Sequence, residues 1–230
     1  YMKISSTSFL CSLFFMAFSA SVFANPDPVK PFVVVLDAGH GGKDPGNLGN
    51  GYMEKIIALK IALEAGALLS SYQDIKVIYT RDSDNFVALT QRGAIANKAK
   101  ADIFISIHCD GFTNPKPSGA SVFVMGMSKL KANMDVAMRE NSAIYLEDNY
   151  KQKYDGFDPK SAESYIVFSL MQNTYLNQSL QIAEEVESEF SNRANRKSRG
   201  VKQAPFYVIS RTNMPSILVE CGFLTNPKEE

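Results

Sequence analysis

The chain carries no net charge, because 24 lysines and arginines balance 24 aspartates and glutamates over 230 residues. A protein that binds nucleic acid along an extended basic face needs an excess of positive charge, so the balance argues against that class of partner. Hydrophobic residues make up 45% of the chain. This composition is typical of a globular protein, and the length suffices for one domain with a sizeable core.

The sequence is also poor in cysteine. Cys11 lies in an apolar N-terminal stretch, and only Cys109 and Cys221 occur farther along the chain. Two cysteines are too few for a disulfide scaffold, so stability has to come from the hydrophobic core. We expect Cys109 and Cys221 to be free thiols, although the sequence leaves a disulfide between them open.

The apolar run near the N-terminus, residues 9–18 (FLCSLFFMAF), is too short to span a bilayer as a helix. Lys3 precedes it, and the small residues of a VFA triplet follow at residues 22–24, which together match a secretory signal peptide. We therefore predict a signal peptide over residues 1–24, a leader over residues 25–31, and export to the periplasm or the cell exterior. An uncleaved anchor is the alternative. After cleavage, no membrane span is expected.

The rest of the chain alternates short apolar runs with amphipathic stretches. This alternation predicts an α/β fold in a single domain over residues 32–230, with a twisted, mostly parallel or mixed sheet of about six strands and helices on both faces. The expected strands are residues 32–36, 76–79, 103–107, 120–125, 206–209 and 216–219. The expected helices are residues 53–69, 91–100 (with Thr90 as N-cap) and 179–192.

Residues 128–178 break this alternation. They are long, polar and partly helical, and the middle of the segment is charged and rich in turn residues. Because it has too few apolar residues for a core of its own, we interpret it as a helical surface insertion rather than a second domain.

The chain has only two histidines, and both follow predicted strands. His40 follows the first strand and His108 the third, while Glu220 ends the last. In an open α/β sheet, ligands bind beyond the carboxyl ends of the strands. A single histidine at such a position is usually structural. Here both histidines of the chain and a glutamate lie at strand ends, which indicates a functional site.

A metal centre fits these residues best. The loop GHGGKDPG after the first strand lacks the spacing of a phosphate-binding loop. A catalytic zinc ion takes three protein ligands from histidine and carboxylate and keeps one position open. His40 and His108 supply two nitrogens, and Glu54, at the start of the first helix, is the candidate for the third ligand. The alternative for Glu54 is a partner of the helix dipole.

Glu220 is the candidate general base, because a carboxylate beside an activated water can accept its proton. Asp37 and Asp110 also follow strands and are candidates to orient the histidines, although Asp37 fits a turn equally well. The chain has no GxSxG serine-nucleophile motif. A cysteine nucleophile is disfavoured, since His108 and Cys109 are neighbours on one strand and point to opposite faces.

Three segments of the sequence resemble one family. VVVLDAGHGGKDPG with the following YMEK, then ADIFISIHCD, then ILVECGFLTNP, are similar to the zinc-dependent N-acetylmuramoyl-L-alanine amidases of the type-3 amidase family. The resemblance implies one Zn²⁺ held by His40, Glu54 and His108, with Glu220 as the catalytic glutamate. It also implies a peptidoglycan hydrolase that cuts between N-acetylmuramic acid and L-alanine during cell-wall remodelling or daughter-cell separation.

In some members of that family, an inserted helix blocks the zinc site until an activator protein displaces it. The insertion here, with VAMRENSAIYLEDNY, looks similar. Glu140 is the candidate inhibitory zinc contact, Glu147 is its competitor, and a solvated polar face is the plain alternative. The family usually continues into a closing helix beyond the NP turn, so we expect that the chain is truncated near Glu230.

Two other functions stay open at this stage. A zinc peptidase could cut within the stem peptide instead, and a non-catalytic protein could keep the fold to bind the cell wall. The presence of all three candidate ligands together with Glu220 favours the amidase, because a binding module has no need of them.

Overall fold

A computed structural model of the chain describes residues 30–49, 51–170 and 174–229. The predicted signal peptide, residues 1–24, lies outside the described residues, as does the leader up to residue 29. The fold is carried by the compact unit Pro31–Glu230. Among the described helices, none is both long and apolar enough to cross a membrane.

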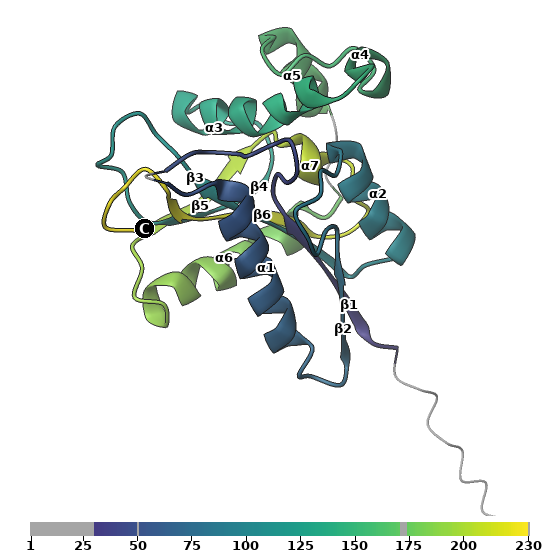
Figure 1. Cartoon of the computed structure of the whole chain (residues 1–230). Helices are drawn as coiled ribbons and strands as arrows, with labels where there is room; N and C mark the ends of the chain where they lie inside the picture. Colours follow the sequence, from purple (N-terminus) through teal and green to yellow (C-terminus); the bar gives the residue numbers. More distant parts are fainter. Residues whose placement is uncertain (1–29, 50, 171–173, 230) are drawn as a thin grey trace, which may run out of the picture. The chain divides into compact units, whose positions relative to one another are not determined.

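A six-stranded mixed sheet forms the centre of this unit (Figure 1). Its strands are β1 (Phe32–Ala38), β2 (Ile75–Tyr79), β3 (Ile103–Asp110), β4 (Ala120–Met125), β5 (Ser198–Ala204) and β6 (Ser216–Phe223). Their order across the sheet is β2-β1-β3-β6-β4-β5, and every neighbouring pair is parallel except β4 and β6. The predicted α/β fold is confirmed.

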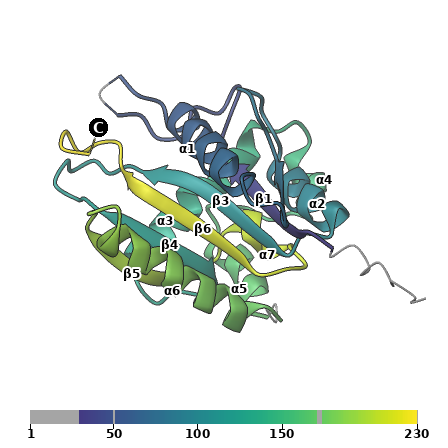
Figure 2. The ribbon, with the colours of Figure 1, turned by 90° about the horizontal axis from the view of Figure 1, so that it is seen from below.

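Helices cover both faces of the sheet (Figures 1 and 2). On one face, α1 (Glu54–Leu69) packs with β1 and β3, and α6 (Leu176–Asn192) packs with β4 and β5. On the other face lie α2 (Leu89–Ala99), α3 (Lys131–Asn141) and the short α7 (Tyr207–Ser210). The strands between them are buried on both sides, which explains their continuous apolar runs.

The expected strand at residues 206–209 is wrong, because this segment forms α7 and the fifth strand is β5 instead. The four residues are all buried, and a short apolar run of this kind does not distinguish a buried helical turn from a strand. β5 lies at the edge of the sheet and is mostly polar, so its sequence lacks the apolar signal of an inner strand. The predicted N-cap at Thr90 is also wrong, since α2 begins at Leu89.

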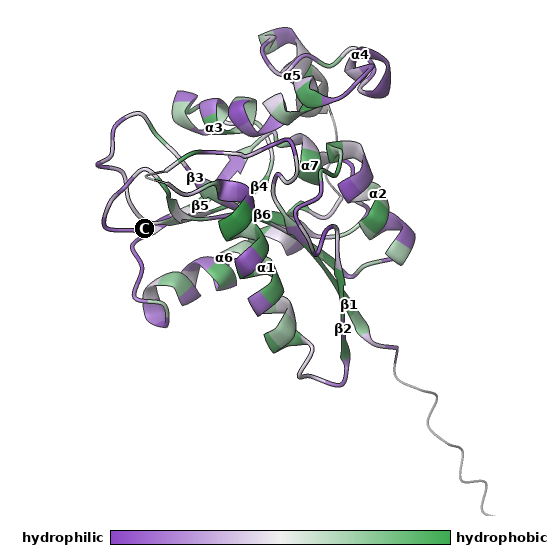
Figure 3. Ribbon diagram, in the orientation of Figure 1, coloured by the Kyte–Doolittle hydropathy of each residue, from purple (hydrophilic) through white to green (hydrophobic). Residues whose placement is uncertain are grey.

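The segment of residues 128–178 contains α3, a 3-10 turn (Ser142–Leu146), α4 (Tyr150–Lys153) and α5 (Ala162–Leu170). Its buried apolar side chains join the main core instead of forming a separate one: Ala137, Ile144, Tyr154 and Tyr165 all belong to the cluster that contains Phe206 and Leu218. Figure 3 shows the contrast between the apolar strands β1 and β2 and the hydrophilic α4. α3 is therefore fastened to the sheet by packing.

Candidate metal centre

The site lies at the carboxyl ends of β1 and β3 and the neighbouring strand β6. His108 lies in β3 and is paired in register with Glu220 of β6. His40 follows the end of β1 by two residues. β1 and β6 flank β3 on its two sides and run parallel to it. The three residues therefore lie at the same edge of the sheet, where ligands bind in open α/β folds.

The loop between β1 and α1 turns back to bring Glu54 to the same point. Two isolated bridges, Gly41 with Asp44 and Leu48 with Met53, close the loop on itself. His40 adopts a left-handed backbone conformation with φ 60°, which is uncommon outside glycine and is concentrated at functional sites. Glu54 opens α1 and is fully buried.

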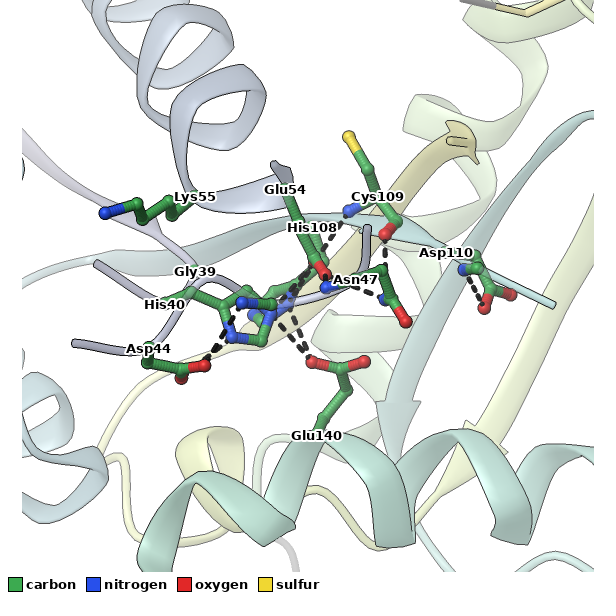
Figure 4. A network of polar contacts seen from close by, with 12 residues as sticks. Gly39, His40, Asp44, Asn47, Glu54, Lys55, His108, Cys109, Asp110 and Glu140 are labelled. Carbon is green, nitrogen blue, oxygen red and sulfur yellow. Dashed lines mark hydrogen bonds and ion pairs between the residues drawn. The ribbon is translucent and has the colours of Figure 1, made fainter. Parts of the chain in front are cut away.

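Four donor atoms meet in this space: His40 Nε2, Glu54 Oε1, His108 Nδ1 and Glu140 Oε2 (Figure 4). Glu54 Oε1 lies 3.0 Å from each imidazole nitrogen, and Glu140 Oε2 lies 3.0 Å and 3.2 Å from the same two atoms. Ligands at about 2.0 Å from a tetrahedral zinc ion are separated by roughly 3.3 Å. The cluster therefore has the dimensions of a four-ligand metal site.

Two of these donors have no hydrogen bond although they are buried. His40 Nε2 and Glu140 Oε2 contact each other at 3.0 Å without hydrogen-bond geometry. A buried polar atom without a partner is costly and needs an explanation. A shared cation supplies one, since both atoms would then be ligands. The donor set thus fits a metal ion.

Other side chains hold the candidate ligands in place. Asp44 Oδ2 lies 2.9 Å from His40 Nδ1, which leaves Nε2 to face the centre. Glu54 accepts hydrogen bonds from the backbone N–H of Cys109 at 2.9 Å and from the backbone and side-chain amides of Asn47, both at 2.8 Å. The sequence analysis did not identify Asp44 or Asn47 as parts of the site.

The structure gives Asp37 and Asp110 other partners. Asp37 lies beneath the loop and accepts hydrogen bonds from Thr80 at 2.6 Å, Ser106 at 2.6 Å and Arg92 at 2.9 Å. Asp110 forms an ion pair of 2.6 Å with Arg139 of α3. The carboxylate in contact with His40 through Nδ1 is Asp44.

Glu220 is buried beside the cluster, with 1% of its surface exposed and no hydrogen bond to either carboxylate oxygen. Burial, together with the negative charges of Asp110, Glu140 and Glu54, raises the pKa of Glu220 well above its usual value. A bound cation reverses such local electrostatics and favours the ionised carboxylate. A buried, unpartnered carboxyl group next to a metal site has the properties of a proton-transfer group.

The comparisons with known proteins agree with this geometry. The sequence profile of the family described as N-acetylmuramoyl-L-alanine amidase matches residues 34–230. The chain belongs to this amidase family. The predicted enzyme class, a peptidoglycan hydrolase that acts as an N-acetylmuramoyl-L-alanine amidase, is confirmed.

Two curated relatives show the extent of the similarity. The chain is 40% identical over 202 residues to N-acetylmuramoyl-L-alanine amidase AmiA of Escherichia coli (strain K12), a match that covers 86% of the chain and 68% of the relative. It is 34% identical over 208 residues to the amidase AmiC of Escherichia coli O6:H1, covering 87% of the chain and 48% of AmiC.

Solved amidase structures share the fold. An N-acetylmuramoyl-L-alanine amidase from Clostridium difficile 630 superposes with a TM-score of 0.63 and 26% identity, covering 87% of the chain and 84% of that structure. The CwlD amidase from Clostridioides difficile, solved in complex with the GerS lipoprotein, matches with a TM-score of 0.51 and 27% identity over 86% of the chain and 85% of CwlD.

The protonation of the cluster follows from its crowded charges. Burial opposes charge on His108, but its contacts with Glu140 and Glu54 outweigh burial and raise its pKa to about 9. Burial likewise opposes ionisation of Glu54, yet His40 and the other contacts lower its pKa to about 2. The histidines therefore carry the protons that neutralise the carboxylates, and a metal ion has to displace these protons.

Cys109 and Cys221 follow His108 and Glu220 on β3 and β6. Both are free thiols in the structure. They line a cavity between α1 and α6 together with Ile61 and Phe190.

Proposed function

We propose that this chain hydrolyses the amide between the lactyl group of N-acetylmuramic acid and L-alanine with one zinc ion held by His40, Glu54 and His108. One observation carries the proposal. Carboxylate oxygens lie 3.0–3.2 Å from the two imidazole nitrogens of the cluster, and the buried carboxyl group of Glu220 beside them has no hydrogen bond. When bound, zinc acts as a Lewis acid and lowers the pKa of a coordinated water toward about 7.

The protein's own groups handle the protons. Glu220 accepts the proton of the attacking water and returns it to the departing L-alanine nitrogen, because its side chain has no competing hydrogen bond and lies beside His108 in the sheet. Asp44 fixes the tautomer of His40 through Nδ1. The amides of Asn47 and Cys109 keep Glu54 in one orientation.

Glu140 is proposed to hold the site closed. Its carboxylate reaches both imidazoles from α3 and takes the place that a water and the substrate carbonyl need. Arg139 ties the same helix to Asp110, and the fully buried Ala137 packs it against the core. Activity then requires that α3 moves away.

A partner that displaces α3 follows from this arrangement. The CwlD neighbour, which was solved with a lipoprotein, supports the idea that proteins of this fold bind a second protein. We place residues 32–230 as the amidase domain, with residues 128–178 as its inhibitory insertion. We also propose that residues 1–24 direct export to the periplasm or cell exterior, where peptidoglycan is found.

Replacement of Glu220 by glutamine tests the assignment. Glu220→Gln keeps the shape of the side chain but cannot accept the proton, so we expect unchanged zinc content and a loss of hydrolysis of at least about a hundredfold. The variant and the parent are compared with and without Glu140→Ala, so that inhibition does not mask activity.

Mass spectrometry of digested muropeptides identifies the reaction. Free glycan with an intact stem peptide is the expected product, whereas shortened stems would indicate a peptidase and an undigested wall a binding protein. Retained hydrolysis in Glu220→Gln would remove Glu220 from the mechanism. Separately, His108→Ala is expected to lower the zinc content, and an unchanged metal stoichiometry would reject His108 as a ligand.

A further inference from the structure

A second cavity opens directly beside the candidate metal centre. It has a volume of about 490 Å³ and lies between α3 and the β4–β5 side of the sheet, with Phe112, Phe123 and Phe223 among its lining residues. Asp110 and Arg139 also line it. Asp110 is two residues beyond His108 on β3, which corresponds to roughly 7 Å along a strand.

The charges of this cavity do not cancel. Four cations line it, namely Lys131, Arg139, Arg199 and Lys202, against two anions, Asp110 and Asp135. Both anions are already paired, since Arg139 binds Asp110 at 2.6 Å and Lys131 binds Asp135 at 2.7 Å.

Arg199 and Lys202 of β5 remain. Neither forms a salt bridge with any residue that the structure describes. The cavity therefore offers two positive charges that form no salt bridge with the described residues.

Contacts with neighbouring residues hold the side chains of Lys202 and Arg199 in place. Lys202 is partly buried, donates a hydrogen bond of 2.8 Å to Ser121 and lies 5.3 Å from the centre of the Phe123 ring. The Arg199 guanidinium lies 5.0 Å from the centre of the Phe223 ring and donates to the Ser118 carbonyl. Burial and the neighbouring charge of Arg199 lower the pKa of Lys202. An anion between the two would relieve this repulsion.

The position of Lys202 links the cavity to the reaction centre. Ser121, which accepts the hydrogen bond from Lys202, is paired in register with Glu220. One side chain thus separates the Lys202 ammonium from the strand position that carries the proposed general base. Once α3 has moved, a substrate held at the metal centre would extend its next residues along the β4–β5 side of this cavity, where Lys202 lies, within one or two residue lengths.

We propose that Lys202 and Arg199 form a subsite for a free carboxylate of the stem peptide, on the L-alanine side of the scissile amide. This inference rests on the proposed amidase function and names the part of the substrate that the chain recognises. The stem peptide continues after L-alanine with a γ-linked D-glutamate, whose α-carboxylate is free unless it is amidated. A carboxylate matches the two cations, and the aromatic rings cover the aliphatic part of the peptide.

Binding of two matched dipeptides tests the subsite on the full chain. L-Alanyl-D-glutamate carries the free α-carboxylate, and L-alanyl-D-isoglutamine carries a carboxamide of the same shape at that position. The γ-carboxyl group is amidated in both, as it is in the stem peptide. Because Arg199 and Lys202 belong to β5 and not to α3, calorimetric titration of these short peptides needs no activator. We expect the carboxylate form to bind about tenfold more tightly, as one well-placed charged pair provides.

Lys202→Gln should bind the carboxylate and carboxamide dipeptides with similar affinity. Lys202→Arg should keep most of the preference for the carboxylate dipeptide. Lys76→Gln, at an exposed position on β2 far across the sheet, is the matched control and should keep the wild-type preference. Equal binding of both dipeptides to the wild type, no binding of either, or a preference that survives in the Arg199→Gln/Lys202→Gln double variant would overturn the proposal. Circular dichroism confirms that each variant is folded.

Hydrolysis is measured separately, so the two proposals fail in different ways. Carboxylate-dependent binding without amide cleavage would contradict the proposed mechanism and leave the subsite intact. Amide cleavage that treats carboxylate and carboxamide stems alike, with the same KM in wild type and Lys202→Gln, would contradict the subsite and leave the mechanism intact.

Discussion

Gly46 sits where the glycine-rich loop passes between two candidate ligands. Its backbone has φ 68°, and a Cβ atom there would lie 2.6 Å from the His40 ring and 2.7 Å from the Glu54 side chain. Those distances are shorter than any tolerated carbon contact. A side chain at residue 46 would therefore push His40 and Glu54 apart.

We expect Gly46→Ala to lose zinc, because the methyl group displaces two ligands at once. Gly51→Ala is the matched control, since Gly51 also has a positive φ of 94° but open space around its Cβ position. Both variants share a backbone cost of about 1–2 kcal/mol. Only Gly46→Ala should lower the metal content measured by atomic absorption, and equal zinc in both variants would refute this role of the loop.

The residues of the site differ in how far the sequence predicts them. His40, Glu54, His108 and Glu220 follow from strand ends and a helix start. The structure brings the first three together with Glu140 and pairs Glu220 in register with His108. Asp44 could not be assigned in advance, because its contact with His40 depends on the left-handed backbone of that histidine.

Asp37 is a residue whose role the sequence leaves open. The sequence offers it as a group that orients a histidine or as a turn residue, and the structure pairs it with Arg92, 55 positions away on α2. The Arg92 side chain is almost fully buried, and a buried arginine requires a carboxylate partner. The sequence around Asp37 does not show that a distant arginine will need this carboxylate in the folded chain.

At the scale of elements, we propose that the activity of the enzyme depends on the position of α3. Glu140→Ala removes the carboxylate that reaches both imidazoles, and we expect amidase activity of the isolated protein to rise by about tenfold, equivalent to about 1.4 kcal/mol in favour of the open site. Release of soluble muropeptides from purified peptidoglycan provides the measurement.

Glu147→Gln is the control for this change. Glu147 is also buried, but it accepts hydrogen bonds from Tyr154 and Lys153, away from the cluster. Its replacement should leave activity at the wild-type level. If both variants behave alike, or if Glu140→Ala shows no gain, Glu140 does not inhibit the enzyme.

The sequence predicts a strand correctly where the strand is buried along its whole length. β1, β3, β4 and β6 are buried on both faces and give continuous apolar runs in the sequence. β5 and α7 were confused because an edge strand can be polar and a buried helical turn can be entirely apolar. Periodicity has no information to separate the two cases.

At the scale of the whole molecule, the balance of 24 positive and 24 negative residues hides opposite local fields. The candidate metal centre gathers Glu54, Glu140 and Glu220 in one buried space, while the neighbouring cavity holds unpaired Arg199 and Lys202. We propose a zinc ion for the first of these sites and a substrate carboxylate for the second. Composition alone shows neither, since each field arises only when distant strands meet.

The buried histidines couple global stability to pH when no metal is bound. The pKa of His108 is about 9 in the folded chain, against about 6.5 in the unfolded chain. A group with a raised folded pKa contributes its full stabilisation below pH 6.5 and loses it as the pH rises through 9. The difference amounts to about 3 kcal/mol, or roughly 10 °C in Tm for a chain of this size.

We therefore expect the Tm of the EDTA-treated protein to fall between pH 6.5 and pH 9, and the stabilisation by added zinc to grow over the same interval, because zinc requires neutral histidines. Differential scanning fluorimetry at half-unit pH steps, with EDTA and with zinc, measures both trends. His108→Gln serves as the control and should flatten the EDTA curve. A metal-free Tm that stays constant from pH 6.5 to 9, or a zinc effect that shrinks with rising pH, would show that His108 does not hold its proton against Glu54 and Glu140.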